Sequence, residues 1–276
     1  MKSEYVTMQP DEAKAWIAGR KQGEYTLLDV RQDWEYDEGH IPGATHVPLP
    51  LLDDRLGELD PQKPTVVYCL SGGRSSAAAS LLKGKGFGEV YNLMGGMNGW
   101  EGAAAVGPKS AGMLFFTGLE TIEEIIAMAC RMEVNLGIFY TTMTAKAEGE
   151  VAETLNRLAG FEEKHKTWLL TIYRQMAGYD LEPEFLTARA ATPDGPPLEG
   201  GLTAEEFIEL NFPDFDDPRG VVEAGMMFEA QAMDLYMRYA AKTNSAETGE
   251  LLTRLAQEEK GHLKALGTLL DRLGKA

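Results

Sequence analysis

Cysteine and histidine are scarce in this chain, with only two and four of them in 276 residues. Two cysteines cannot build the disulfide framework of a secreted domain, which favours a reducing compartment. No apolar run approaches the roughly 20 residues that a membrane-spanning helix requires. The N-terminal residues 1–5 lack the basic and apolar pattern of a signal peptide. We therefore expect a cytoplasmic protein that does not bind membranes.

Basic side chains are also few, with 26 lysines and arginines against 43 acidic residues and a net charge of −17. An acidic surface repels phosphate backbones and anionic lipids, which argues against nucleic acid as a partner. The length is sufficient for two domains, each with its own hydrophobic core.

Short apolar runs alternate with helical stretches in the first third of the sequence. Strands are predicted at Tyr25–Val30, Thr65–Cys69 and Val90–Leu93, and helices at Asp11–Arg20 and Ser75–Lys83. Alternating strands and helices form a parallel sheet with flanking helices, so residues 1–105 are predicted to be an α/β domain. Residues 102–118 are rich in glycine, alanine and other small residues, which places a linker at 106–118.

Cys69 stands where the second predicted strand ends and the next helix begins. The residues that follow it are Leu70, Ser71, Gly72, Gly73, Arg74 and Ser75. Backbone N–H groups at a helix N-terminus, two glycines and the charge of Arg74 all favour the thiolate, which is the nucleophilic form of cysteine. The alternative is a structural cysteine buried at a strand end, which this glycine-rich loop makes less plausible.

The length of the loop distinguishes two kinds of chemistry. Four residues separate Cys69 from Arg74, where the loop of protein tyrosine phosphatases has five, and a tighter ring suits a sulfane sulfur. The loop occurs together with three further motifs, at residues 28–31, 35–44 and 95–100. With these motifs in this order, residues 8–103 resemble a rhodanese (sulfurtransferase) domain.

The rhodanese resemblance implies roles for particular residues. Cys69 would carry a persulfide, Arg74 would bind the anion, and Asp29 and Arg31 would support the loop. The substrate-binding loop would consist of Leu70, Ser71, Gly72, Gly73 and Ser75, and the partners would be a small sulfur donor and acceptor. We interpret His40 as a structural turn residue.

Four long helices are predicted in the rest of the chain, at about residues 119–147, 150–178, 218–243 and 246–273. The connection between the second and third contains Pro183, Pro193, Pro196, Pro197, Pro213 and Pro218. A short helix is expected within it at Thr203–Leu210, with Thr203 as N-cap and Glu206 completing a capping box. Four helices with one long crossover have the ferritin-like topology, so residues 119–276 are predicted to form an all-α four-helix bundle.

Two glutamate–histidine pairs with the same spacing occur in this helical region. Each pair follows a single glutamate by 29 or 30 residues, and that glutamate has a tyrosine seven residues after it. The glutamates are Glu133, Glu162, Glu229 and Glu259, the histidines are His165 and His262, and the tyrosines are Tyr140 and Tyr236. Residues i and i+3 share a helix face, so four carboxylates and two imidazoles are expected to meet in the core. This is the ligand set of a di-iron or di-manganese centre, whereas solvated or ion-paired side chains are the alternative.

Residues 112–276 resemble the ferritin-like superfamily, and rubrerythrins most closely. The resemblance implies that the four glutamates and two histidines bind two iron ions, with manganese possible, and that Tyr140 and Tyr236 lie near them. Ala232 stands where rubrerythrins carry a further liganding glutamate. Their Cys-x-x-Cys module is absent as well, which implies an external electron donor. No organic cofactor is evident, and we expect a homodimer formed through the bundle.

Together the two resemblances predict a sulfurtransferase with a Cys69 persulfide that also carries a di-iron oxidoreductase centre. That centre is expected to act on peroxide, dioxygen or sulfane sulfur. Two alternatives remain open. One is a sulfur carrier joined to a non-catalytic iron-binding bundle, and the other is a rubrerythrin-type peroxidase with a regulatory rhodanese domain. Cys130, three residues before Glu133, we interpret as a small buried side chain.

Overall fold

The computed structural model describes residues 5–110, 120–180, 198, 203–211 and 215–273. The chain divides into two compact units, Met1–Lys109 and Ser110–Ala276, and each is described by itself. The division falls within the predicted linker 106–118, of which residues 111–118 lie outside the described residues.

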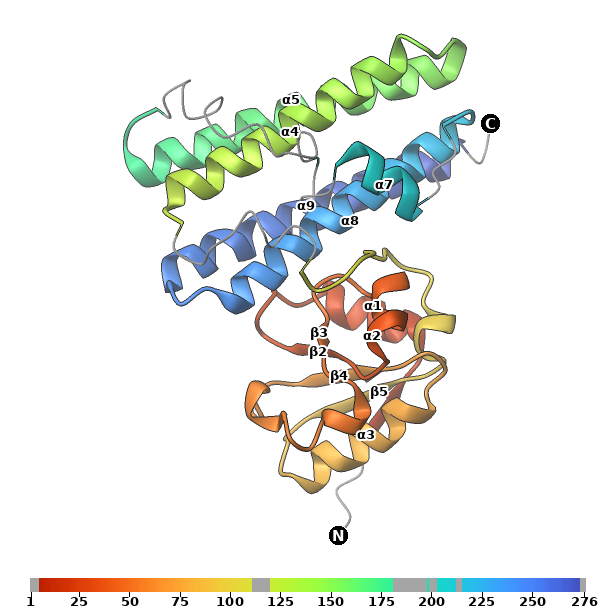
Figure 1. The fold of residues 1–276 in the computed structure, drawn as a ribbon, viewed down its shortest axis with the longest axis vertical. Coiled ribbons are helices and arrows are strands. Elements are labelled where there is room, and N and C mark those ends of the chain that lie inside the picture. The colour runs from red at the N-terminus through yellow and green to blue at the C-terminus, as the bar shows by residue number, and fades with distance from the viewer. Residues whose placement is uncertain (1–4, 111–119, 181–197, 199–202, 212–214, 274–276) are drawn as a thin grey trace. The chain divides into compact units, whose positions relative to one another are not determined.

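The first unit contains one sheet of five parallel strands in the order β1-β5-β4-β2-β3 (Figure 1). The strands are β1 (Val6–Met8), β2 (Thr26–Asp29), β3 (Thr45–His46), β4 (Thr65–Tyr68) and β5 (Val90–Leu93). The helices are α1 (Pro10–Ala18), α2 (Asp33–Glu38) and α3 (Gly73–Gly84), with 3-10 turns at Leu49–Leu51, Leu56–Glu58 and Gly96–Gly99. Cys69 directly follows β4, the central strand, so it lies at the carboxyl edge of the sheet, where open α/β sheets bind ligands.

Both faces of the sheet are buried, with α1 and α2 on one side and α3 on the other (Figure 1). Successive strand side chains point to opposite faces. Leu27 and Val66 therefore pack with α1 and α2, whereas Leu28 and Val67 pack against α3. Each is at most 4% exposed, and burial of such a side chain stabilises the fold by roughly 1.5–3 kcal/mol.

The predicted fold class is confirmed, but several elements of the first unit differ from expectation. β1 and β3 were not predicted, because three and two residues are too few to show an alternating pattern. α2 was also missed; it begins at a capping box in which the Gln32 N–H donates to the Glu35 carboxylate at 3.0 Å. The predicted strands at 25–30 and 65–69 are shorter, since they end at Asp29 and Tyr68.

The second unit is built from four long helices, as predicted. They are α4 (Ile122–Thr144), α5 (Gly149–Ala177), α8 (Pro218–Lys242) and α9 (Ala246–Leu273). α4 packs along α5 and α8 packs along α9, which gives two hairpins (Figure 1). Thr121 fixes the start of α4, because its hydroxyl accepts from the Glu124 N–H at 3.3 Å while the Glu124 carboxylate accepts from the Thr121 N–H at 3.0 Å.

The connection between the hairpins contains the short helix α7 (Ala204–Asn211). Its predicted capping box is confirmed. The Thr203 N–H donates to the Glu206 carboxylate at 2.7 Å, and the Glu206 N–H donates to the Thr203 hydroxyl at 3.2 Å. Pro218 is the first residue of α8, a position that tolerates proline. The other prolines of this connection, Pro183, Pro193, Pro196, Pro197 and Pro213, lie outside the described residues.

The two hairpins share an apolar core. Its central cluster takes side chains from every long helix, among them Ile126, Ile172, Leu235 and Leu252. At Gly225 on α8, an added Cβ would lie 3.3 Å from Leu158 of α5 and 3.4 Å from the Tyr140 hydroxyl of α4, so a residue without a side chain lets the hairpins approach. None of the described helices combines the length and the apolar character needed to cross a membrane.

In the first unit, the turn after β5 packs directly on the backbone of the Cys69 loop. The Met97 N–H donates to the Cys69 carbonyl at 2.7 Å, and the Asn98 N–H donates to the Leu70 carbonyl at 2.9 Å. Gly96, between β5 and these donors, has a φ of 55°, and a Cβ at this position would overlap the Cys69 carbonyl. The glycine is therefore required both by its backbone conformation and by this close approach.

Replacing Gly96 by alanine should destabilise the first unit by more than about 2 kcal/mol, because left-handed backbone strain and steric overlap act together. The free energy of unfolding in urea measures this effect. Gly57→Ala is the matched control, since a Cβ there meets nothing within 4 Å. Equal stability of the two variants would show that the turn does not press on the loop.

Candidate functional site

Cys69 is surrounded by hydrogen-bond donors that converge on its sulfur. Gly72, which precedes α3, has a φ of 99°, and this left-handed conformation turns the loop back over the sulfur. The Gly72 N–H donates to Sγ at 3.1 Å, and the Ser75 hydroxyl donates to it at 3.4 Å. The side chain of Cys69 is 1% exposed. The loop thus forms a concave nest of donors of the kind that binds anions.

The two free cysteines have opposite acidities. Burial acts to raise the pKa of the Cys69 thiol, but hydrogen bonds from Ser75, Gly72 and Ser71 outweigh it and hold this pKa below its usual value. For Cys130 on α4, burial raises the pKa to about 12. Cys69 is therefore the more acidic and more reactive thiol, whereas Cys130 remains protonated and buried, as interpreted from the sequence.

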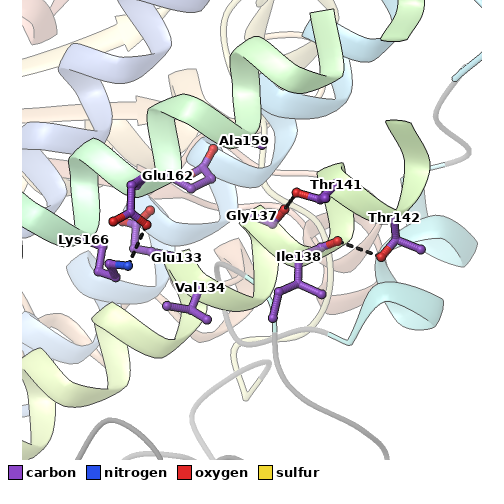
Figure 2. A pocket seen from close by; sticks show the side chains of 10 residues that line it. Glu133, Val134, Gly137, Ile138, Thr141, Thr142, Ala159, Glu162 and Lys166 are labelled. Atoms are coloured by element: carbon purple, nitrogen blue, oxygen red, sulfur yellow. Dashed lines mark hydrogen bonds and ion pairs between the residues drawn. The ribbon is translucent and has the colours of Figure 1, made fainter. Parts of the chain in front are cut away.

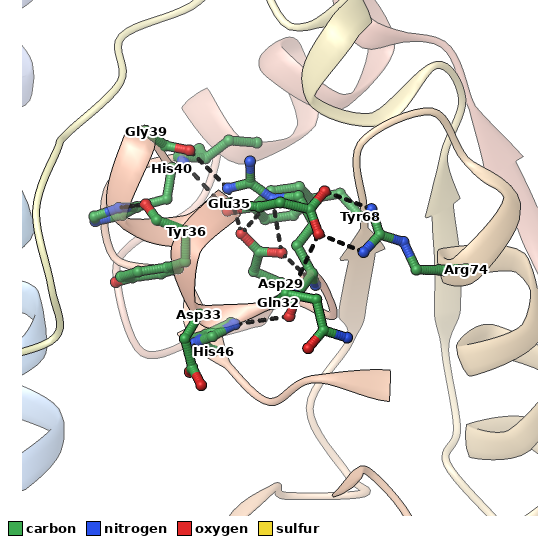
Figure 3. A network of polar contacts seen from close by, with 12 residues as sticks. Asp29, Gln32, Asp33, Glu35, Tyr36, Gly39, His40, His46, Tyr68 and Arg74 are labelled. Carbon is green, nitrogen blue, oxygen red and sulfur yellow. Dashed lines mark hydrogen bonds and ion pairs between the residues drawn. The ribbon is translucent and has the colours of Figure 1, made fainter. Parts of the chain in front are cut away.

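The guanidinium of Arg74 is shared between the sulfur and a carboxylate. Its two terminal nitrogens bind the Glu35 carboxylate at 2.5 and 2.6 Å (Figure 3). Glu35 is the main cause of the raised pKa of Arg74, with a smaller contribution from Cys69, and Arg74 in turn lowers the pKa of Glu35. The expectation that a full positive charge faces the thiolate was therefore too simple. Glu35 was assigned no role from the sequence, although it lies in the motif at residues 35–44.

Asp29 and Arg31 form a buried ion pair. Asp29 is the last residue of β2 and is paired with Tyr68, the last residue of β4, which leads to Cys69. Arg31 Nη2 donates to Asp29 Oδ2 and to the Gly39 carbonyl, both at 2.7 Å. The Arg31 guanidinium lies 5.6 Å from the centre of the Tyr68 ring, and Tyr68 directly precedes Cys69. The pair thus braces the end of β4, from which the loop starts.

His40 is held by structural contacts. Its ring stacks on Tyr36 with 3.7 Å between centroids, and its Nδ1 lies 2.9 Å from the Tyr36 carbonyl (Figure 3). Its backbone also pairs with Ala105. These contacts agree with its interpretation as a structural turn residue.

The second unit collects six acidic and imidazole side chains from its four long helices. They are Glu133 on α4, Glu162 and His165 on α5, Glu229 on α8, and Glu259 and His262 on α9. All four carboxylates are at most 4% exposed. The structure therefore brings together every residue of the predicted ligand set, in the interior of the bundle.

The cluster has two halves that share one contact. His165 Nδ1 lies 3.3 Å from Glu133 Oε2, and His262 Nδ1 lies 3.3 Å from Glu229 Oε2. The two imidazole rings stack in parallel with 3.4 Å between centroids. Ligand atoms of Glu133, Glu162 and His165 lie within 4.8 Å of one another, and so do those of His165, Glu229 and His262. The repeated sequence pattern thus produces the same histidine–glutamate contact in both halves, and His165 belongs to both groups.

The spacing of these atoms fits a metal ion. His165 Nδ1 and Glu162 Oε2 are 3.4 Å apart, yet neither forms a hydrogen bond with any described residue. Two atoms that each lie about 2.1 Å from one ion are separated by roughly 3.0–3.4 Å. Because buried polar atoms are costly without a partner, an ion between them satisfies both. Carboxylate and imidazole donors suit iron or manganese.

On the other half, Glu259 and His262 attract each other directly, with 2.7 Å between Oε2 and Nδ1. Burial acts to lower the pKa of His262, but the Glu259 carboxylate outweighs it and raises this pKa. Burial likewise acts to raise the pKa of Glu259, and His262 more than offsets it. The Glu259 carboxylate thus favours a positive charge beside it. A bound metal ion would also supply such a charge.

Residues around the cluster are buried and tightly packed. Tyr140 and Tyr236 are 1% and 2% exposed, and the Tyr140 hydroxyl lies against Gly225 of α8. Their place beside bound metal stays a prediction. Ala232, one turn after Glu229, is fully buried, so no carboxylate occupies the position of the additional rubrerythrin ligand.

A cavity of about 370 Å³ between α4 and α5 was not predicted (Figure 2). Glu133 and Glu162 line it together with Gly137. The sequence feature that could have indicated the cavity is Gly137, which has no side chain and lies one turn after Glu133. Whether this glycine leaves a cavity depends on how closely α5 approaches α4.

Two family models match the chain. The Rhodanese-like domain model matches residues 9–103, and the Rubrerythrin model matches residues 124–210. The second match includes Glu133, Glu162 and His165 but ends before α8. The placement of Glu229, Glu259 and His262 beside them therefore rests on the geometry of the cluster.

Curated relatives match the first unit. Thiosulfate sulfurtransferase GlpE of Pseudomonas syringae pv. syringae (strain B728a) is 37% identical over 98 residues, which is 36% of this chain and 89% of that protein. YrkF and YqhL of Bacillus subtilis (strain 168) are 42% and 43% identical over 76 residues, 28% of this chain. The chain spans only 41% and 60% of the lengths of these two relatives. The chain belongs to the rhodanese family, and its rhodanese-like domain is joined to a rubrerythrin domain.

Proposed function

We propose that this chain is a two-domain enzyme. Its first domain transfers sulfane sulfur through a persulfide on Cys69, and its second holds a di-iron centre that performs redox chemistry. The proposal is carried by one observation, the presence in a single chain of an acidic buried thiol and a buried carboxylate–histidine cluster.

In the sulfur-transfer cycle, the Cys69 thiolate attacks the outer sulfur of a sulfane donor. A bond forms between Sγ and that sulfur, the bond within the donor breaks, and the donor leaves with its electron pair as a thiolate or sulfite. An acceptor nucleophile then attacks the terminal sulfur, and Cys69 leaves as the thiolate. No net oxidation or reduction occurs, because each step exchanges one sulfur bond for another.

The loop stabilises the negative charge at every stage of this cycle. Hydrogen-bond donors of Ser75, Gly72 and Ser71 lower the pKa of Cys69. The same donors can stabilise negative charge on the terminal sulfur of the persulfide. Leu70 and Ser71 add no cation at the exposed mouth, and Arg74 is shared with Glu35. Thiosulfate is one candidate donor, since the relative GlpE is named for it, but a donor of lower charge suits this loop better.

In the second domain, two bound iron ions would supply redox chemistry toward peroxide, dioxygen or sulfane sulfur, and manganese accepts the same ligands. Glu162 with His165, and Glu259 with His262, would each hold one ion, while Glu133 and Glu229 supply the remaining carboxylates. Apolar side chains of the four helices pack around them. Electrons would come from an external donor or from the Cys69 persulfide, whose effective concentration the covalent link raises.

One observation favours a second candidate, an iron-binding bundle without turnover joined to a sulfur carrier. The only cysteines are Cys69 and Cys130, so the chain carries no cysteine-ligated electron-transfer module beside the cluster. Consumption of peroxide or dioxygen by the iron-loaded chain over many turnovers distinguishes the enzyme from the store.

Cys69→Ser should abolish sulfur transfer to cyanide and leave the metal content unchanged, because the nucleophile and the cluster belong to separate domains. Thiocyanate formation and iron analysis measure the two properties. Cys130→Ser is the matched control and should retain transfer. Residual thiocyanate formation by Cys69→Ser would refute the assignment.

Ser75→Ala should raise the pKa of Cys69, because it removes a hydrogen bond that favours the thiolate. Alkylation by iodoacetamide follows the thiolate, so its rate rises with pH through this pKa, and the rise should occur at higher pH in the variant. At a pH below both pKa values the variant should therefore react more slowly, about tenfold if its pKa is higher by one. Ser80→Ala, on the exposed side of α3, should leave the profile unchanged; a coincident profile for Ser75→Ala would count against this account of the loop.

Iron should bind at two ions per chain and stabilise the bundle by about 2.7 kcal/mol per ion when free metal exceeds its dissociation constant a hundredfold. Glu229→Gln should lose part of this gain, because it replaces a carboxylate ligand by a neutral amide. Urea unfolding with and without iron measures the gain in each variant. Glu153→Gln, on the exposed face of α5, should keep the full gain, and a Glu229→Gln variant that keeps it as well would contradict the ligand set.

A further inference from the structure

The cavity on the α4–α5 hairpin reaches the carboxylate–histidine cluster from outside the bundle (Figure 2). Glu133 and Glu162 line it, although they are only 2% and 4% exposed. The same two carboxylates lie 3.3 and 3.4 Å from His165 Nδ1. They therefore form a floor that separates the cavity from the proposed metal centre.

The cavity wall combines apolar side chains with polar ones, among them Thr141 and Thr142. Val134 and Ile138, which line it on α4, are 38% and 59% exposed. Ala159 faces them from α5. Large aliphatic side chains that remain exposed beside a buried carboxylate pair gain stability when an apolar occupant covers them.

The charges around the cavity select against anions. Glu133, Glu162 and Glu163 contribute three carboxylates, and Lys166, the one lysine among the described residues that line it, already binds Glu163 at 2.6 Å. An anion entering this space would meet more negative than positive charge. A neutral group that donates a hydrogen bond to the floor carboxylates meets no such penalty.

We propose that this cavity binds an uncharged small organic molecule that has an apolar body and one polar hydroxyl-bearing end, and that the fitting substrate class is an organic hydroperoxide. The volume of about 370 Å³ is within the range of small-molecule pockets, roughly 300–1,000 Å³. The apolar body lies on Val134 and Ile138, and the O–H group points to Glu133 and Glu162. The choice of hydroperoxide rests on the proposed function of the metal centre, whereas the binding site itself does not.

Reduction of such a molecule breaks its O–O bond and yields an alcohol and water. The balance requires two electrons and two protons for each hydroperoxide. The external electron donor of the proposed function supplies the electrons, and the protons come from solvent through the open side of the cavity. The alcohol product has the same apolar body and a hydroxyl end, so it binds the same site without reacting.

A larger side chain substituted at Gly137 would fill the cavity. An added Cβ there would lie 3.5 Å from Glu162 Cβ, which is ordinary contact, so substitution is tolerated while a longer side chain extends over the floor. Gly160 is the matched position. It is exposed on α5, meets nothing within 4 Å, and is not part of the lining.

The binding test uses the metal-free full chain and cumyl alcohol, the product of cumene hydroperoxide, in titration calorimetry. Wild type and Gly160→Leu should bind it with similar affinity, Gly137→Leu should bind at least about tenfold more weakly, and benzoate should not bind. Circular dichroism verifies folding. Ile138→Ser, at an exposed position, should weaken binding severalfold and decides the matter if Gly137→Leu does not fold. Equal binding by all variants, or binding of benzoate as tight as that of the alcohol, would overturn the proposal. The proposal would also be overturned if the wild type forms a dimer that does not bind the alcohol and if Ile138→Ser dissociates this dimer. A second copy of the chain would then cover the cavity.

A second measurement separates this site from the redox function. In the iron-loaded, reduced protein, Gly137→Leu should slow reoxidation by cumene hydroperoxide at least about tenfold and leave reoxidation by hydrogen peroxide within about threefold of wild type. If cumyl alcohol binds as expected but neither peroxide reacts, the redox function fails and the binding site stands. If both peroxides react and the alcohol does not bind, the site fails and the redox function stands.

Discussion

Four carboxylates buried together are the constraint on which the helical unit depends. Each is at most 4% exposed, and unpaired charges in an apolar interior are among the most destabilising features that a fold can contain. The stacked histidines lie within 3.4 Å of these carboxylates, and Glu259 raises the pKa of His262, which favours its compensating positive charge. A metal ion bound in each half would supply the rest and would join α4 to α5 and α8 to α9 through common ligands. Function and stability of the bundle would then depend on the same atoms.

The rhodanese-like domain buries negative charge in a different way. Its thiolate is stabilised by N–H and hydroxyl donors from Gly72 and Ser75, while the nearest guanidinium is shared with Glu35. Several donors fixed around one loop can stabilise negative charge both at Sγ and at a second sulfur bound to it. The two units thus solve the same electrostatic problem with means that suit sulfur transfer in one case and metal binding in the other.

The parts of the site that could be predicted depend on local spacing. Glu162 and His165 share a helix face because they are three residues apart, and Cys69 follows a strand that its own apolar residues identify. The parts that were missed depend on long-range approach. Arg74 meets Glu35 across 39 residues of sequence, and Gly96 presses on the Cys69 carbonyl from a separate turn. Likewise β1 and β3 are too short to show a pattern, and the cavity beside Gly137 exists only because α5 lies opposite.

Anomalous diffraction from iron-loaded crystals, recorded at the iron absorption edge, would locate the metal ions among the six side chains. We expect two peaks per chain, one between Glu162 and His165 and one between Glu259 and His262. The carboxylates of Glu133 and Glu229 should contact these peaks. A single peak, peaks outside this cluster, or no peak with the imidazoles still paired to the carboxylates would contradict a di-iron centre at this position.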